Sequence, residues 1–290
     1  MNTEPHHRVG AIKIQRILET QIDFSPPASL LPDWDDGALL GMNGLHHNPR
    51  TTTQSVGTSV HSWLLTTDTR TILVDTGIGN HKKRAAPVFD NLSNPYLERL
   101  EIAGQTRQTI DFVLMTHIHS DHVGWNTILS NDRWVPTFPK AKYFLPRVGR
   151  DDFESEAGRA RPNHAIYIDS VAPILEANLA ELVEPTISEV LPGITYIPTP
   201  GHSVDHMSIL IESNGEKAII AGDILHHPAQ VYRPEWNSVF CALPEQARAS
   251  RLRVLEQVAD SGALYLSSHM TETSAGRVRR EGNGFIWRFE

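Results

Sequence analysis

Short apolar runs separated by polar turns predict an order of strands first, then helices, then strands again. An irregular apolar and polar alternation predicts an opening strand within residues 9–24, and the turn-rich stretch 25–49 predicts a loop. Two more strands are predicted at 56–66 and 71–74. The second of these stops at the turn 75–79, whose glycines allow a sharp change of direction.

The middle of the chain combines a buried strand with a helical segment. Residues 96–103 predict a short helix closed by Gly104, and the apolar run within 111–116 is typical of a buried strand. A further strand is predicted at 141–145. We expect residues 147–185 to be a mostly helical insertion, because apolar side chains recur there at helical spacing. They are Val171, Ile174, Leu175, Leu179 and Leu182.

The C-terminal half resembles the N-terminal half in its order of elements. Strand-like runs occur at 194–197, 207–211 and 217–221, followed by a predicted helix at 244–260 and a strand at 263–267. No break in composition separates the halves. We therefore predict a single α/β domain over residues 1–290, in which helices cover β-sheets.

Composition and charge exclude several classes of protein. Apolar residues make up 40% of the chain and charged residues 21%, which excludes a mainly disordered protein. A net charge of -8 provides no positive field for nucleic acid, and short basic clusters such as Lys82-Lys83-Arg84 and Arg277 with Arg279-Arg280 are expected to be solvated. No apolar stretch is long enough for a signal peptide or a membrane span, so we expect a soluble, cytoplasmic protein.

Histidine is the residue type that points to chemistry. The chain has 15 His but a single cysteine, Cys241, which excludes internal disulfides and an all-cysteine zinc site. Four potential ligands follow the predicted strand 111–116: His117, His119, Asp121 and His122. In extended backbone, residues two apart face the same side while adjacent residues diverge. This spacing favours two metal ions over one.

Two imidazoles leave a divalent cation short of ligands, so further ligands must come from elsewhere in the chain. The candidates are His202 in Thr199-Pro200-Gly201-His202, Asp223 in Ala221-Gly222-Asp223, and His269 in Ser267-Ser268-His269. Each follows a predicted strand or lies in a glycine-containing turn, where a scaffold holds a side chain rigidly. In contrast, we interpret His61, His164 and His206 as structural histidines.

This pattern resembles that of the metallo-β-lactamase-fold hydrolases. The resemblance consists of H-x-H-x-D-H, a distant Pro-Gly-His, then Gly-Asp and a final His, and it extends from about Val56 to the end of the chain, including Leu73-Val74-Asp75-Thr76-Gly77. It implies an α/β fold, specifically a four-layer αββα sandwich. It also implies one metal ion on His117, His119 and His202, a second on Asp121, His122 and His269, and Asp223 bridging both. Zinc is the expected metal, and Asp75 is expected to orient a ligand.

Particular residues favour some branches of this family over others. Asp223 stands where true β-lactamases usually lack a bridging acid, and residue 119 is His where flavo-di-iron enzymes have Glu. The chain resembles N-acyl homoserine lactonases and methyl parathion hydrolase. Like the latter, it carries a long insertion between His122 and His202 and has a His, His226, three residues after Asp223.

The resemblance implies hydrolysis of a lactone or ester by a hydroxide shared between two metal ions. Asp121 and Asp223 are expected to orient this hydroxide and relay its proton, while His226 either hydrogen-bonds the substrate oxygen or is structural. The alternatives are a phosphotriesterase, a glyoxalase II-like thioesterase and an iron persulfide dioxygenase. The expected partners are a small-molecule substrate and, as relatives suggest, a second copy in a homodimer. Two tryptophans each allow two interpretations. Trp125 either forms a wall of the pocket or packs in the core. Trp34 either covers the site or acts as a plug at the surface.

Overall fold

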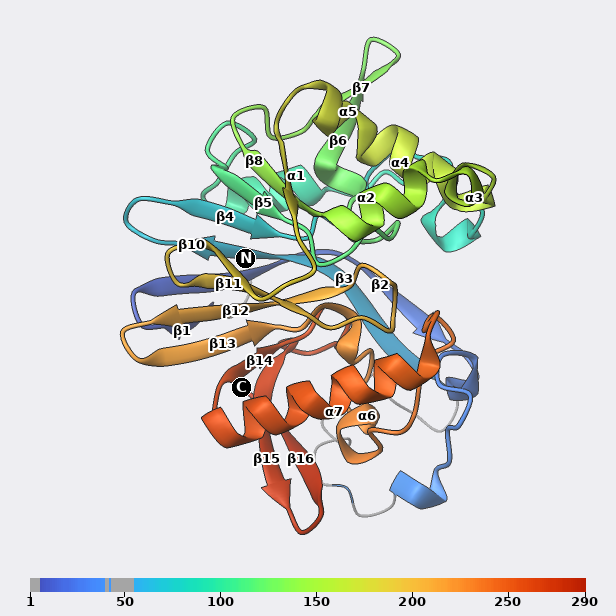
Figure 1. Ribbon diagram of the computed structural model, residues 1–290, viewed down its shortest axis with the longest axis vertical. Coiled ribbons are helices and arrows are strands. Elements are labelled where there is room, and N and C mark those ends of the chain that lie inside the picture. The colour runs from blue at the N-terminus through green and yellow to red at the C-terminus, as the bar shows by residue number, and fades with distance from the viewer. Residues whose placement is uncertain (1–5, 40–41, 43–54) are drawn as a thin grey trace. The chain divides into compact units, whose positions relative to one another are not determined.

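The computed structural model of this chain describes residues 6–39, 42 and 55–290 (Figure 1). Two compact units can be distinguished, each assembled from two separate segments of the chain. The first unit comprises Met1–Thr20 and Val60–Pro185, and the second comprises Gln21–Ser59 and Thr186–Glu290. The grouping of residues 1–290 into one domain stays a prediction.

A seven-stranded sheet with the strand order β1-β2-β3-β4-β5-β8-β9 lies mainly in the first unit (Figure 1). The strands are β1 (His6–Val9), β2 (Ile12–Phe24), β3 (Val56–Thr66), β4 (Thr71–Val74), β5 (Phe112–Leu114), β8 (Lys142–Pro146) and β9 (Ala180–Val183). The pairs β1–β2 and β3–β4 are antiparallel, whereas β4, β5, β8 and β9 run parallel. Parallel strands end at the same edge of a sheet, so the segments that follow β4 and β5 begin side by side.

Helices pack on this sheet through one apolar cluster. The register places Leu73, Val113 and Tyr143 beside one another on three adjacent strands, and all three are fully buried. Leu100 and Ile174 from two of the helices belong to the same cluster. The helices are α1 (Tyr96–Ile102), α2 (Arg147–Glu154), α3 (Glu156–Arg159), α4 (Ala165–Ser170) and α5 (Ala172–Glu176), and a hairpin of β6 (Thr127–Ser130) and β7 (Arg133–Pro136) accompanies them.

The predicted helical insertion over 147–185 differs from the structure at its end. Helices α2 to α5 lie within 147–176, but Ala180–Val183 form strand β9, which pairs with β8 so that Leu182 lies opposite Leu145. The helical interpretation of Leu179 and Leu182 is therefore wrong. The spacing of apolar residues alone could not distinguish a strand from a helix here, because a strand of four residues is too short to show a clear periodicity.

The expectation that the cluster Lys82-Lys83-Arg84 is solvated is wrong for Lys82 and Arg84, whereas Lys83 is exposed. Lys82 is fully buried, and its ammonium group donates to Thr127 Oγ1 at 2.8 Å and lies 3.3 Å from the carboxylate of Asp169. Arg84 forms a two-pronged ion pair with the same carboxylate, at 2.6 and 2.8 Å. Burial lowers the pKa of Lys82 to about 8, although Asp169 opposes this effect. These contacts attach α4 to the turn that follows β4.

The second unit contains another seven-stranded sheet, with the order β10-β11-β12-β13-β14-β15-β16 (Figure 1). Its strands are β10 (Ser188–Leu191), β11 (Ile194–Pro198), β12 (Met207–Ser213), β13 (Glu216–Ile220), β14 (Leu264–Leu266), β15 (Ala275–Glu281) and β16 (Gly284–Phe289). Both β11 and β13 are antiparallel to β12, and β14 is parallel to β13. Consequently β11, β13 and β14 all end at one edge of this sheet.

Helix α7 (Pro244–Ser261) crosses this sheet, and the short helix α6 (Ala229–Tyr232) lies near it (Figure 1). The side chains of Val254, Leu255 and Val258 recur at helical spacing and pack in one cluster with Ile219 and Tyr265 of the strands. The helix ends where Gly262 adopts a left-handed conformation with φ 65°. Here the predicted helix at 244–260 is confirmed.

Two 3₁₀ turns, Pro27–Ser29 and Gly37–Leu39, occupy the described part of the predicted loop 25–49. Residues 40–41 and 43–49 of that loop lie outside the described residues. Among the residues that the structure describes, no helix combines the length and apolar character that crossing a membrane requires.

Candidate metal centre

The predicted ligands follow the ends of aligned strands in both units. In the first unit, Asp75 directly follows β4, and the segment from His117 to His122 comes just after β5. In the second unit, His202, Asp223 and His269 follow β11, β13 and β14. Within each unit, the strand directions bring these segments to one edge of the sheet. Each unit thus gathers its own set of candidate ligands.

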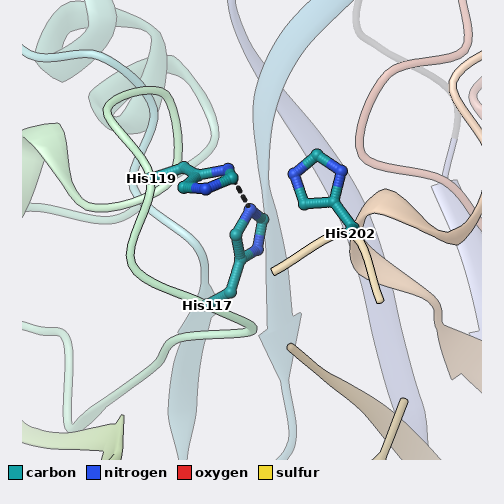
Figure 2. A group of neighbouring side chains, drawn as sticks. All are labelled: His117, His119 and His202. Atoms are coloured by element: carbon teal, nitrogen blue, oxygen red, sulfur yellow. Dashed lines mark hydrogen bonds between the residues drawn. The ribbon is translucent and has the colours of Figure 1, made fainter. Parts of the chain in front are cut away.

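In the first unit, the imidazoles of His117 and His119 converge. His117 Nε2 and His119 Nδ1 lie 3.0 Å apart, and the dashed line in Figure 2 marks this contact. Two nitrogen ligands on one tetrahedral zinc ion, each about 2.0 Å from it, are separated by roughly 3.3 Å. The pair is therefore spaced as two ligands of one ion. Thr116 Oγ1 lies 3.0 Å from His117 Nδ1 and orients the ring from its other side.

Asp75 orients His122, as the resemblance implied. The Asp75 carboxylate is 2% exposed, accepts hydrogen bonds from the Thr116 backbone N–H and hydroxyl at 2.8 Å each, and lies 2.9 Å from His122 Nδ1. A carboxylate that accepts from Nδ1–H leaves the Nε2 lone pair available to a metal ion. His122 Nε2 lies 3.8 Å from the half-buried Asp121 carboxylate.

In the second unit, three imidazoles surround the carboxylate of Asp223. His202 Nε2 lies 3.1 Å from Asp223 Oδ2, and His226 Nε2 lies 3.3 Å from the same oxygen. His269 Nε2 lies 3.0 Å from Oδ1 and 3.1 Å from Oδ2. All four residues are at least 95% buried. A buried carboxylate close to several imidazole nitrogens offers the ligand types that zinc takes.

The partner of His269 shows why a cation fits this cluster. His269 Nδ1 lies 2.9 Å from the backbone carbonyl oxygen of Ser59, which can only accept a hydrogen bond. In the neutral ring Nδ1 is then the donor, and Nε2 directs a lone pair at the Asp223 carboxylate. A positive charge between these two acceptors removes their repulsion. The donor set in both units, imidazole nitrogen with carboxylate oxygen, suits zinc.

Helix α7 supports the turn that carries His202. Gly201 has φ 138°, and a Cβ at this position would overlap the Ala247 backbone nitrogen of α7. The Leu243 N–H donates to Gly201 O, and the Ala242 N–H donates to His202 O, both at 2.9 Å. The glycine of the Pro-Gly-His motif is thus required by the close approach of α7 to the turn.

His226 is buried against both polar and apolar rings. Its imidazole stacks on His269 with a centroid distance of 5.2 Å and lies 6.0 Å from the ring of Phe240. Burial lowers the pKa of His226, although Asp223 opposes the shift, so the ring is neutral at pH 7. Gln230 accepts the backbone N–H of His226 at 2.7 Å and fixes its loop. A neutral ring at this place has one N–H to donate.

The two tryptophans that the sequence singled out, Trp125 and Trp34, both pack against other rings. Trp125 is 4% exposed, stacks on Tyr96 at 5.1 Å and donates from Nε1 to the buried carboxylate of Glu19 at 2.9 Å, which favours packing in the core. The ring also lines a cavity with Asn94 and Leu97, but none of the predicted metal ligands lines this cavity. Trp34 is half-buried and packs edge-on against His227 at 5.4 Å. This contact favours the surface plug.

Of the three histidines interpreted as structural, two pack against aromatic rings. His61 lies edge-on to Trp63 at 5.2 Å, and His164 stacks on Tyr167 at 5.6 Å. His206 differs, because its Nε2 accepts the backbone N–H of Asp223 at 2.8 Å. Sequence reasoning missed this contact. The available signal was the second histidine of His202-Ser203-Val204-Asp205-His206, placed before a strand that pairs with the one leading to Asp223.

Comparisons with known proteins identify the family of the chain. A model of the Metallo-beta-lactamase superfamily matches residues 56–269. Over 166 residues the chain is 26% identical to the N-acyl homoserine lactonase of Bacillus cereus, a match that covers 53% of this chain and 58% of that enzyme. The chain spans about half the length of the curated relatives it matches.

Solved structures share the fold over the whole chain. The hydrolase AbOPH of the beta lactamase superfamily superposes with a TM-score of 0.82 at 22% identity, covering 100% of this chain and 98% of that one. AidC, described as a dizinc quorum-quenching lactonase, superposes with a TM-score of 0.78 at 21% identity, covering 99% of this chain and 97% of that one. The predicted metallo-β-lactamase fold is therefore confirmed.

Proposed function

The chain belongs to the metallo-beta-lactamase superfamily, and on that premise we propose that it is a dinuclear metal-dependent hydrolase that opens lactones or cleaves esters. One observation carries the proposal. The buried Asp223 carboxylate faces three imidazole nitrogens at 3.0–3.3 Å, an arrangement that suits a bridging ligand between two cations.

The proposed metal sites follow the ligand sets that the family pattern implies. One zinc ion would be held by His117, His119 and His202, and the other by Asp121, His122 and His269, with Asp223 shared. The 3.0 Å separation of the His117 and His119 nitrogens supports the first set. The orientation of His122 by Asp75 supports the second, because a fixed imidazole tautomer is typical of metal ligands.

The chemistry then divides between the metal ions and the protein. When bound, two such ions lower the pKa of a water molecule toward neutrality and polarise the substrate carbonyl. Asp223 orients the attacking water through its carboxylate. Asp121, which is half-buried, accepts the proton of that water and returns it to the departing alkoxide. The neutral His226 donates its N–H to the substrate oxygen.

A lactone or ester is the substrate class that we favour. The support is the likeness to N-acyl homoserine lactonases in sequence and to a dizinc lactonase in fold. A phosphotriesterase is the second candidate, because the chain resembles methyl parathion hydrolase in having a His three residues after Asp223. This residue, His226, contacts the Asp223 carboxylate. Both candidates use the same attack of an activated water on a polarised centre. A homodimer stays a prediction.

The test is elemental analysis of the purified protein followed by a substrate panel. We expect two zinc ions per chain and acid release from γ-lactones or aryl esters, with less nitrophenol released from phosphotriesters. Dominant cleavage of phosphotriesters would favour the second candidate. Dominant cleavage of acyl-glutathione would indicate a thioesterase, and oxygen consumption with one iron a persulfide dioxygenase. Full metal content without turnover on any of these would refute the hydrolase.

The role of Asp223 is tested by Asp223→Ala. Removing the carboxylate leaves three buried imidazoles without the group that they surround, so we expect loss of at least one metal ion and nearly all turnover. Asp260→Ala is the matched control, because Asp260 lies on α7 in the same unit and pairs with exposed Arg280. Retention of both metal ions and of wild-type turnover by Asp223→Ala would contradict the assignment.

A further inference from the structure

His206 is a buried histidine that contacts the backbone of the proposed metal ligand Asp223. Its side chain is 1% exposed, and its Nε2 accepts the backbone N–H of Asp223 at 2.8 Å. A backbone N–H can only donate, so Nε2 must present a lone pair. The ring therefore holds its proton at Nδ1 in this structure. The contact fixes both the tautomer of the ring and the direction of a backbone group of a proposed ligand.

The other side of the ring is held by the turn that carries His202. Nδ1 lies 3.0 Å from the backbone oxygen of Thr199 and 2.9 Å from its hydroxyl, and the Thr199 N–H donates to His206 O at 3.0 Å. A second connection runs parallel to the first. Thr199 Oγ1 lies 3.0 Å from the Ser208 hydroxyl, which donates to Ala221 O at 3.1 Å.

These contacts join two turns that the sequence separates. Thr199 lies three residues before His202 and Ala221 two residues before Asp223. Asp223 itself has φ −94° and ψ 28°, in the sparsely populated bridge region, so its backbone depends on its surroundings. The His206 ring thus contacts both Thr199 and the Asp223 backbone.

We propose that His206 is a positioning residue that holds the Asp223 carboxylate in register with His202. The inference rests on the metal site proposed above. The separation of 3.1 Å between His202 Nε2 and Asp223 Oδ2 depends on the relative placement of the two turns. Without the acceptor at Nε2, the buried Asp223 N–H loses its partner, and the turn rotates to find another. The carboxylate then leaves the place where it can bridge two ions.

The variant His206→Gln distinguishes a positioning role of His206 from a packing role. In His206→Gln, the side-chain oxygen reaches the place of Nε2 and accepts the Asp223 N–H, whereas His206→Leu fills similar space without an acceptor. His206→Asn retains a polar amide but is one methylene too short to reach. His61→Leu is the matched control, since His61 is also a buried histidine, at 3% exposure, but packs on Trp63.

The measurement is zinc affinity by chelator competition, together with the visible absorption of the cobalt-substituted protein. Changes in groups that orient metal ligands cost about 10- to 100-fold in metal affinity. We expect such a loss and an altered cobalt spectrum for His206→Leu, values within a few-fold of wild type for His206→Gln, and wild-type values for His61→Leu. A merely structural role would lower thermal stability without changing the cobalt spectrum of the folded protein.

Different outcomes address the two proposals separately. If wild-type protein binds no metal, the proposed function fails and this inference fails with it. If wild type binds two zinc ions and folded His206→Leu binds them with equal affinity and an unchanged cobalt spectrum, only the inference is overturned. Should His206→Leu not fold, the comparison of His206→Asn with His206→Gln decides. Equal affinity of these two variants would then refute the positioning role.

Discussion

His227 provides a direct test of how burial of a histidine affects stability. The ring is fully buried, its Nδ1 accepts the Ala229 N–H at 3.1 Å, and Trp34 packs edge-on against it. Burial lowers the pKa of His227 from 6.5 to about 3. Between these two values, the unfolded chain holds a proton at this ring and the folded chain does not. Stability therefore falls as the pH decreases below 6.5.

The magnitude follows from the difference between the two pKa values. One pKa unit corresponds to about 1.4 kcal/mol, so lowering the pH from 8 to 5 removes about 2 kcal/mol of unfolding free energy through this one group. This is a large share of a typical total of about 5–15 kcal/mol. His227→Asn removes the titration, and its side-chain oxygen can still accept the Ala229 N–H. The variant loses the ring contact with Trp34 at every pH.

Urea unfolding of both proteins, saturated with zinc, at pH 8 and pH 5 measures the effect. We expect His227→Asn to be less stable than wild type at pH 8, and this deficit to shrink by about 2 kcal/mol at pH 5. Contributions of the other titrating groups are common to both proteins and cancel in the comparison. His227→Gln, a second neutral variant, should show the same pH dependence. An equal deficit at both pH values would refute the reasoning.

Three further predictions concern the ligand shell and its supporting turns. Asp75→Leu should weaken zinc binding about 10- to 100-fold in chelator competition, and Asp75→Asn should weaken it less, since the amide retains one acceptor; equal losses would contradict this. His226→Phe should lower turnover and leave metal content unchanged by elemental analysis, while unchanged turnover would assign His226 a structural role. Gly201→Ala should lower the melting temperature because its Cβ overlaps the α7 backbone, whereas Gly215→Ala, with φ 82° but open space, should cost less; a reversed order would exclude the overlap as the cause.

Several elements were predictable because their signals are local. The apolar runs at 71–74 and 111–116 agree with β4 and β5, and the helix predicted at 244–260 agrees with α7. Strand β9 was not predictable in this way. It exists because β8 offers an unpaired edge that its four residues complete, and such an edge is invisible in the spacing of Leu179 and Leu182.

The sequence by itself determined which residues can chelate a metal and the order in which they occur. The six residues from His117 to His122 indicate metal binding by themselves, because folding does not require so many chelating side chains in so short a segment. The family pattern then assigned roles to distant residues such as Asp223.

Only the tertiary structure decided how these groups are oriented and which charges are buried. Lys82 is buried because Asp169, 87 residues away, is folded against it. His206 orients Asp223 across 17 residues, and Ser59 sets the tautomer of His269 across 210. Ligand identity depends on the side chain alone, whereas tautomer, protonation and direction depend on hydrogen-bond partners that only the fold brings together.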